Sequence, residues 1–309
     1  MLVDLRKSIT FAVYYQTITL ISLINNMNTS MIRIEGLTFS YGKKASIFQD
    51  FSLEMEAGKV IGLLGKNGTG KSTLLYLMSG LLRPQGGSVW MKGMDVQKRL
   101  PATLSDLYLV PEEFTLPNLS LQQFVKVNAP FYPRFSRELL RTCLNDFELN
   151  EDIHLGELSM GQKKKAYMCF ALAANTSLLL MDEPTNGLDI PSKSQFRKVI
   201  ASGMTEEKSV VVSTHQVRDI DRLLDQVVVI EGNEVLLNRS VVDITDKLLF
   251  AEQGMNEPTD DALFVQPSVH GNSVIWPNLS GEESPLNLEL LFNALLTERE
   301  KIQAIFNDK

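Results

Sequence analysis

The chain has 309 residues, of which 44% are hydrophobic and 22% charged, a balance that suits one globular α/β domain with an appendage and excludes a disordered or fibrous chain. The formal net charge of −7 argues against a general binder of nucleic acid or anionic lipid, although it leaves room for a local basic site. The two cysteines and three histidines lie apart without motif spacing, which argues against a disulfide framework or a metal cluster and favours a reducing, intracellular compartment.

Residues 1–30 form an extension whose central part, 8–24, is apolar and follows a basic pair. One interpretation is a signal peptide or a membrane anchor. The other, which we favour because the run is short and lacks a clear cleavage motif, is an upstream segment before a start at Met27 or Met31. No other stretch approaches the roughly 20 apolar residues of a membrane-spanning helix, so a transport function would need another chain to form the pore.

Regular structure is expected from Met31 onward, with apolar runs that alternate with turn residues. Strands are predicted over 32–39, 47–55, 60–64, 88–91, 107–110, 178–181, 210–212, 227–230 and 235–237. The last two flank Gly232-Asn233, which is a hairpin signal. Over about residues 119–158, between the strands at 107–110 and 178–181, the apolar residues repeat at helical spacing, so we expect a helical insertion there.

The strongest local motif is the octet Gly65–Ser72, a complete G-x-x-x-x-G-K-S match between the buried strand at 60–64 and a predicted helix over Lys71–Met78. Glycines let the backbone N–H groups turn inward around phosphate oxygens at the positive end of a helix. Lys71 can reach the outer phosphates, and the Ser72 hydroxyl can ligate Mg²⁺. The alternative is a Gly-rich turn without a ligand, which the complete match and its context disfavour.

Two acids, Asp182 and Glu183, end the apolar strand that begins at Leu178. A buried strand presents its last residues at the carboxyl edge of a sheet, where doubly wound sheets bind ligands. Asp182 is therefore placed to hold Mg²⁺, and Glu183 to act as general base toward an attacking water. The alternative is that both acids only cap a strand end in solvent, and the phosphate loop beside them disfavours it.

After about Ser240 the pattern fades, because prolines and glycines interrupt it, and helical periodicity returns over Leu286–Ile305. We interpret residues 241–309 as a small accessory unit that ends in a helix. The basic run Lys163–Lys165 is interpreted as a solvated helix face rather than a phosphate or partner contact.

The ordered set of motifs resembles the ATP-binding cassette (ABC) ATPases over about residues 31–240. Leu158–Gln162 looks like the signature motif, Pro184–Asp189 like the D-loop, and Ser213–His215 like the switch segment, while Tyr41 matches the aromatic residue that stacks on adenine. The resemblance implies an α/β P-loop NTPase fold, that is, an ABC nucleotide-binding domain with a mixed sheet, a helical subdomain over about 113–160 and the small C-terminal accessory unit.

The resemblance also implies the site residues. Glu183 is the expected base and His215 the expected γ-phosphate sensor, and both are expected to be catalytic. The expected magnesium ligands are Ser72, Asp182 and Glu112, the last standing where the family usually has glutamine. The expected ATP contacts are Tyr41, Gly65, Lys66, Asn67, Gly68, Thr69, Gly70, Lys71, Ser72, Thr73, Ser159, Gly161, Gln162 and Asp189. Met160 replaces the first glycine of the signature pair, so its side chain must point away from the nucleotide.

The function implied by the resemblance is ATP hydrolysis, with ATP and Mg²⁺ as cofactors, in an exporter of the two-chain bacterial kind. The implied partners are a transmembrane permease and a second ATPase domain, in a homodimer or heterodimer, and the implied location is cytoplasmic, on the inner face of the membrane. In this family the helical insertion meets the permease, so the aromatic segment Phe131–Phe135 is either a contact or local packing. Alternatives are a soluble cassette ATPase acting on ribosomes or DNA, which a single cassette without a long heptad run disfavours, and a nucleotide switch with little turnover, which Glu183 disfavours.

Overall fold

The computed structural model describes residues 30–42, 45–255, 257–269 and 271–307. The apolar run at 8–24 lies outside the described residues, so both interpretations of it stay predictions. Within the described residues, no helix combines the length and the apolar character that a membrane span requires.

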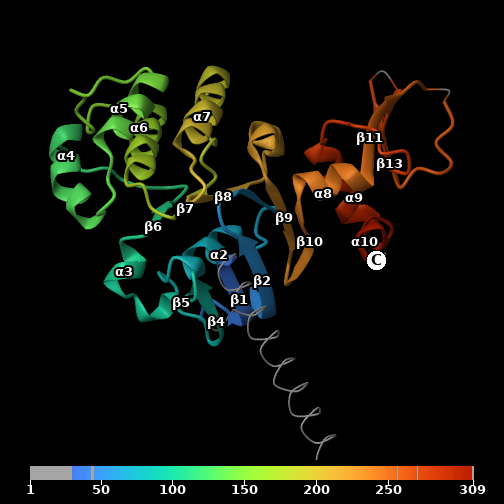
Figure 1. Cartoon of the computed structure of the whole chain (residues 1–309), viewed down its shortest axis with the longest axis horizontal. Coiled ribbons are helices and arrows are strands. Elements are labelled where there is room, and N and C mark those ends of the chain that lie inside the picture. The colour runs from blue at the N-terminus through green and yellow to red at the C-terminus, as the bar shows by residue number, and fades with distance from the viewer. Residues whose placement is uncertain (1–29, 43–44, 256, 270, 308–309) are drawn as a thin grey trace, which may run out of the picture.

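Three sheets organise the part of the chain that the structure describes (Figure 1). A four-stranded antiparallel sheet has the order β2-β1-β4-β5, and its strands are β1 (Ser30–Phe39), β2 (Phe48–Glu56), β4 (Gly86–Met91) and β5 (Met94–Asp95). A six-stranded sheet has the order β10-β9-β3-β8-β7-β6, and its strands are β3 (Val60–Leu64), β6 (Leu107–Val110), β7 (Leu178–Asp182), β8 (Ser209–Thr214), β9 (Gln226–Glu231) and β10 (Glu234–Ser240). All neighbours in this second sheet are parallel except β9 and β10, which form the predicted hairpin, so the sheet is mixed as expected.

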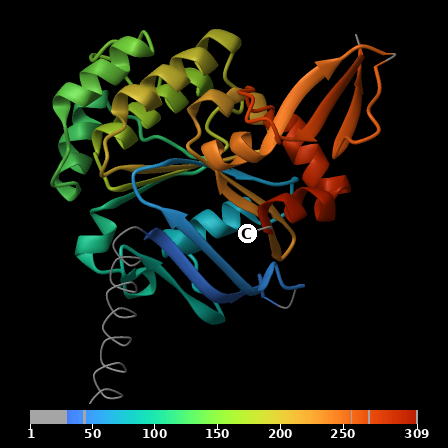
Figure 2. The same cartoon turned by 45° about the vertical axis from the view of Figure 1, so that its right-hand side comes forward.

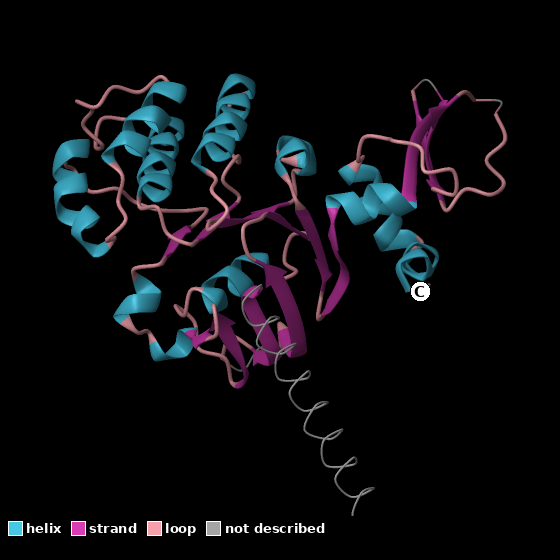
Figure 3. Ribbon diagram, viewed as in Figure 1, coloured by secondary structure: helices cyan, strands magenta, loops and turns pink. Residues whose placement is uncertain are grey.

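Helices cover both faces of the six-stranded sheet, as the view by secondary structure shows (Figure 3). Alternate residues of its buried strands point to opposite faces and so enter two separate hydrophobic cores. One core holds Ile61, Leu63 and Leu180 with helix α2 (Lys71–Met78) and the four-stranded sheet, so α2 lies between the two sheets. The other core holds Val60, Leu179 and their equivalents with several helices, among them α4 (Leu121–Asn128), α5 (Arg137–Asp146), α6 (Met160–Ala173) and α7 (Ile190–Gly203).

The predicted helical insertion contains α4, α5 and the start of α6, and the short helix α3 (Pro101–Leu104) precedes it. Two of these helices begin with a capping box, in which a serine accepts the N–H of the third helical residue and a glutamine returns the bond. The serines are Ser120 for α4 and Ser159 for α6. Aromatic rings around Phe170 of α6, from Tyr108, Phe124 and Phe135, join the insertion to the sheet.

The C-terminal segment is more regular than we expected (Figure 2). It has helix α8 (Val241–Lys247), a sheet of order β11-β13-β12 and two terminal helices, with bounds β11 (Leu248–Gln253), β12 (Phe264–Ser268), β13 (Gly271–Pro277), α9 (Leu288–Thr297) and α10 (Arg299–Asn307). The expectation of one terminal helix was incomplete, because α9 ends at Thr297 and α10 starts afresh at Arg299. Leu291 and Ile302 of these two helices are buried in the same core as α6 and α7, so the C-terminal segment packs against the part of the chain that contains α6 and α7.

Candidate functional site

The loop between β3 and α2 has the shape that a phosphate group needs. Gly68 and Gly70 have φ of 83° and 94°, in the left-handed region that favours glycine, and Gly70 is the N-cap of α2. A Cβ on Gly65 would lie 2.6 Å from the Thr69 hydroxyl and 2.7 Å from the Ile230 carbonyl oxygen. The loop therefore tolerates only glycine at its tightest points, and it leaves the first N–H groups of α2 without helical partners.

The Lys71 side chain folds back inside this loop. Its Nζ donates hydrogen bonds to the carbonyl oxygens of Gly65, at 2.8 Å, and Lys66, at 3.1 Å. Burial lowers the pKa of Lys71, while the charges of Glu183, Asp182 and Glu112 oppose that shift in decreasing order. The expected metal and base residues thus lie close enough to Lys71 for their fields to act on its ammonium, although they are far apart in the sequence.

The sheet register explains why the two acids lie beside the loop. Strand β8 runs between β3 and β7, so that Leu64 pairs with Thr214 and Asp182 pairs with Ser213. Asp182 is 1% exposed, and its Oδ1 accepts a hydrogen bond from the Ser213 hydroxyl at 2.5 Å. The carboxyl end of β8 therefore bridges the phosphate loop and the acids.

Glu183 is held by several contacts to the segment after β8. Its Oε1 accepts the His215 backbone N–H at 3.1 Å and lies 2.7 Å from His215 Nδ1, and its Oε2 accepts the Thr214 hydroxyl at 3.1 Å. Its backbone has a φ of 44°, which is uncommon for a residue with a side chain. The expected base and the expected sensor are in direct contact, and the side chain of His215 is still 37% exposed and can reach outward.

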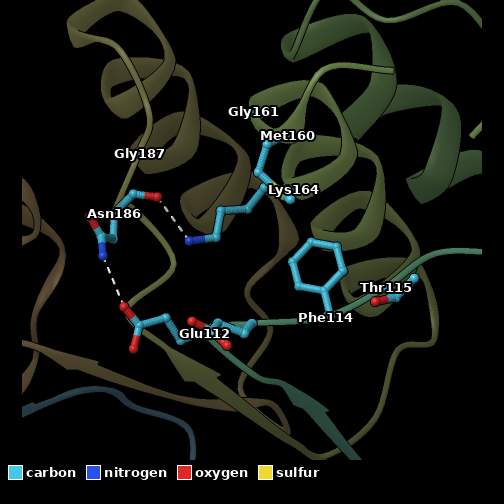
Figure 4. Close-up of a pocket in the computed structure, with 9 residues that line it drawn as sticks. Glu112, Phe114, Thr115, Met160, Gly161, Lys164, Asn186 and Gly187 are labelled. Carbon is cyan, nitrogen blue, oxygen red and sulfur yellow. Dashed lines mark hydrogen bonds between the residues drawn. The ribbon is translucent and has the colours of Figure 1, made fainter. Parts of the chain in front are cut away.

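Glu112 and Tyr41 flank this centre. Glu112 follows β6, and its Oε1 accepts a hydrogen bond from Asn186 Nδ2 at 2.9 Å (Figure 4), so a metal role would compete with that bond. Tyr41 is 43% exposed, packs edge-on against Phe39 and hydrogen-bonds through its hydroxyl to the Thr73 hydroxyl at 3.3 Å. The Tyr41 side chain is thus partly accessible to solvent next to the start of α2, as a base-stacking role requires.

The signature-like residues form a different surface. Ser159 caps α6, with Gln162 completing the capping box at 3.1 Å and 3.3 Å, and a Cβ on Gly161 would meet only the Gly187 carbonyl oxygen, at 4.0 Å. Met160 is 67% exposed. The cavity beside this helix end, drawn in Figure 4, is lined by Glu112, Glu113, Phe114, Thr115, Met160, Gly161, Lys164, Asn186 and Gly187. None of residues 65–72, all of them described, lines this cavity, whereas Glu112, an expected magnesium ligand, does.

Asp189 begins α7 as its N-cap. Its Oδ1 accepts the Ser192 backbone N–H at 2.9 Å. The Ser192 hydroxyl and this N–H lower the pKa of Asp189, which keeps the carboxylate ionised. Asp189 thus has a structural task of its own, and an ATP contact would be additional to it.

The chemistry of these donors suits magnesium and a nucleotide. The expected ligands are one hydroxyl and two carboxylates, which are the hard oxygen ligands that Mg²⁺ takes. Among the described residues, no group of three or more His, Cys, Asp or Glu side chains could form a complete metal site.

Three functional candidates were missed by the sequence argument. Lys164 was assigned to a solvated face, but it is 6% exposed, and its Nζ donates to the carbonyl oxygens of Glu183 and Asn186. Asn186 and Thr214 were not singled out within their motifs, and they contact Glu112 and Glu183. Only the position of Lys164 three residues after Gly161 hinted at such a role, since a helix places i and i+3 on one face.

Comparison with known proteins identifies relatives of one kind. A family model described as ABC transporter matches residues 48–186. The methionine import ATP-binding protein MetN of Carboxydothermus hydrogenoformans is 32% identical over 234 residues, which is 69% of this chain and 67% of the relative. The Nod factor export ATP-binding protein I of Neorhizobium galegae is 26% identical over 257 residues, which is 79% of this chain and 73% of the relative. The ABC transporter ATP-binding protein YtrB of Bacillus subtilis is 27% identical, and this chain spans 65% of its length.

Solved structures agree on the fold. The structure described as an ATP binding subunit of an ABC transporter superposes with a TM-score of 0.62 at 22% identity, covering 69% of this chain and 91% of that one. The predicted P-loop fold with a mixed sheet is therefore confirmed at the level of the whole domain.

Proposed function

Because this chain belongs to the ABC transporter family of ATP-binding proteins, we propose that it binds and hydrolyses MgATP and so powers export through a separate membrane-spanning partner. The observation that carries the proposal is the meeting of three distant segments. Lys71 of the phosphate loop, the acids after β7 and the switch segment after β8 share one edge of the six-stranded sheet. We further propose that residues 31–240 form the catalytic unit, with the helical part over about 113–160, and that 241–309 form an accessory unit.

The loop residues bind the phosphates in this proposal. The N–H groups of Gly65–Thr73 and the Lys71 ammonium surround the anionic oxygens, and on binding the ammonium exchanges the Gly65 and Lys66 carbonyls for phosphate. Ser72, Asp182 and Glu112 hold Mg²⁺, which neutralises charge on the transferred phosphoryl group when bound. Tyr41, whose side chain is partly exposed, stacks on the adenine.

Glu183 acts as the general base toward water. Thr214 and His215 anchor its carboxylate, so that one oxygen keeps an orienting contact while the other accepts the proton. His215 then positions Glu183 and, through its exposed ring edge, senses the outer phosphate.

The second phosphate site supports a pairing of two ATPase chains. Gly161 lines a cavity that none of the phosphate-loop residues 65–72 lines, Ser159 and Gln162 form the capping box at the same end of α6, and Asp189 caps α7. We propose that these residues complete the ATP site of a second copy or of a related chain, and that closure of the pair excludes water. Homodimer and heterodimer are both compatible with this geometry.

The proposed permease contact is an apolar groove between α3 and the aromatic segment. It is lined by Ser79, Leu81, Arg99, Pro101, Ala102, Leu104, Ser105, Leu107, Leu109, Pro130, Phe131, Tyr132 and Pro133. Phe131 and Leu81 are 68% and 59% exposed, which is unusual for large apolar side chains facing water. A cytoplasmic segment of the permease is the proposed occupant, which places the chain on the inner face of the membrane. The exporter direction rests on the Nod factor export relative, whose match covers more of this chain than the match to the import relative.

The deciding experiment is Glu183→Gln in the purified chain. Glutamine keeps the shape and an oxygen for Thr214 but cannot take a proton, so turnover should fall by about 10² to 10⁴ while MgATP affinity stays within about twofold. Glu138→Gln, at an exposed position on α5, is the matched control. Unchanged ATP turnover in Glu183→Gln refutes the assignment of the base, and absence of MgATP binding by the unmodified chain refutes the proposed function.

A further inference from the structure

Lys164 is a buried lysine that lies between two loops of the proposed site. It belongs to α6, one turn after the signature-like residues, and its side chain runs toward the segment after β7 (Figure 4). Its Nζ donates to the Glu183 carbonyl oxygen and to the Asn186 carbonyl oxygen, each at 2.9 Å. A buried ammonium is costly unless its protons are hydrogen-bonded, and here two of the three have main-chain acceptors.

Glu183, one of the two residues whose carbonyl oxygen accepts from Lys164, has an unfavourable backbone conformation. A φ of 44° places it in the left-handed region, which is unfavourable for a residue with a side chain and persists only where surrounding contacts enforce it. Its N–H donates to the Ser213 carbonyl oxygen at 3.1 Å and to the Ser213 hydroxyl at 3.2 Å. Its carbonyl oxygen accepts from Lys164, so both peptide groups around Glu183 are fixed, one by β8 and the other by α6.

Lys164 also lies within a group of acids. Burial lowers the pKa of Lys164, and the charges of Glu112, Glu183 and Asp182 oppose that shift. Asn186 connects the same group to the loop after β6, because its side chain donates to Glu112 while its carbonyl accepts from Lys164. One ammonium therefore joins α6 to the segment after β7, and Asn186 extends this connection to the loop after β6.

We propose that Lys164 is a positioning residue for ATP hydrolysis, whose ammonium fixes the main chain at Glu183 and Asn186 and thereby aims the Glu183 carboxylate. The inference rests on the proposed function of Glu183. The charge of Lys164 acts through the main chain and not on the nucleotide. Its loss should therefore slow the chemical step and leave MgATP binding to the phosphate loop of the same chain intact, because that loop leads into α2 and Lys164 lies on α6.

Steady-state ATP hydrolysis and MgATP titration of the full chain test the proposal. Lys164→Met keeps the length and removes both hydrogen bonds, and it should lower kcat by about 10- to 100-fold, the cost of a misplaced catalytic group, with KM within about twofold. Lys164→Arg, which keeps the charge and the donors, should recover at least about a third of the lost activity. Lys163→Met, the neighbouring position on α6, is the matched control and should keep kcat within about twofold.

The following outcomes overturn the inference. A Lys164→Met variant with kcat within twofold of the unmodified chain shows that the base is aimed without Lys164. A Lys164→Met variant in which kcat falls only together with a lowered Tm and weakened MgATP binding shows a structural role. If Lys164→Met does not fold, Lys164→Gln, which retains one donor group, takes its place. A Lys164→Gln variant whose kcat and KM equal those of the unmodified chain overturns the inference as well. If the unmodified chain and Lys163→Met both fail to hydrolyse ATP, the proposed function fails first, and the two failures are distinguished.

Discussion

Lys208 offers a test of the fold that is independent of the site. Its side chain is buried, with 2% exposed, and Nζ donates to the Leu172 carbonyl oxygen at 3.3 Å near the end of α6. Burial lowers the pKa of Lys208 from 10.5 to about 8, while Cys143 opposes this shift and Arg134 adds to it. At ~1.36 kcal/mol for each pH unit, the interval from 10.5 to about 8 means that the charged side chain lowers the free energy of unfolding by about 3 kcal/mol.

The sign of the effect follows from proton binding. Between pH 8 and 10.5 the unfolded lysine still holds a proton that the folded one has released, so stability rises with pH across this window and is lowest below it. Lys208→Met removes the cost. It also removes one long hydrogen bond, worth about 1 kcal/mol, but the Leu172 carbonyl keeps the N–H of Asn175 at 3.0 Å. We therefore expect Lys208→Met to be more stable by about 2 kcal/mol at pH 7, with the gain gone near pH 10, where the remaining cost of the charge only matches the lost hydrogen bond.

Urea unfolding followed by circular dichroism at pH 7, 8.5 and 10 measures this difference, with equal m values as the check that the two-state reading holds. Lys126→Met, at an exposed position on α4, makes the same chemical change without burial and should alter stability by less than about 0.5 kcal/mol at every pH. A Lys208→Met variant that is less stable at pH 7, or a gain that does not shrink as pH rises, refutes the reasoning.

Two further substitutions test the loop and the groove. Gly65→Ala places a Cβ 2.7 Å from the Ile230 carbonyl oxygen, which β9 holds in place, so the loop must open and MgATP affinity measured by calorimetry should fall by about tenfold or more. An affinity within twofold of the unmodified chain contradicts the rigid-loop argument. Phe131→Asp puts a charge in the exposed groove; Tm should stay within about 2 °C, while co-purification with the multi-span membrane partner is lost. Retained co-purification contradicts the assignment of the groove.

The parts of the site that could be predicted are those that local sequence determines. The phosphate loop needs glycine at fixed positions, so Gly68 and Gly70 mark it without any knowledge of the rest of the chain. The acids could be placed because a run of buried residues must be an interior strand, and interior parallel strands end at one edge of the sheet. The capping box of α6 is also a local pattern, since Ser159 and Gln162 stand three residues apart.

The parts that could not be predicted depend on long-range packing. The sequence around Lys164 does not distinguish it from Lys163. The carbonyl acceptors that offset the cost of burying the Lys164 ammonium come from the loop after β7, which packs against α6. The C-terminal strands were not predicted because Pro267 and Pro277 interrupt the sequence pattern of β12 and β13. Pro267 lies in β12, which is an edge strand of its sheet, and Pro277 is the last residue of β13, so each proline stands where a missing N–H is tolerated.

The register of β8 joins the fold to the proposed chemistry. The last two residues of β8 and the residue after it each contact an acid at the end of β7: the Ser213 hydroxyl contacts Asp182, and Thr214 and His215 contact Glu183, which directly follows β7. Because side chains on a strand alternate in direction, a slip of β8 by one residue would turn the Ser213 hydroxyl away from Asp182 and bury a different set of residues in the two cores. The hydrophobic pattern that fixes the register of β8 for stability therefore also fixes which hydroxyl holds the proposed magnesium ligand and which groups orient the proposed base.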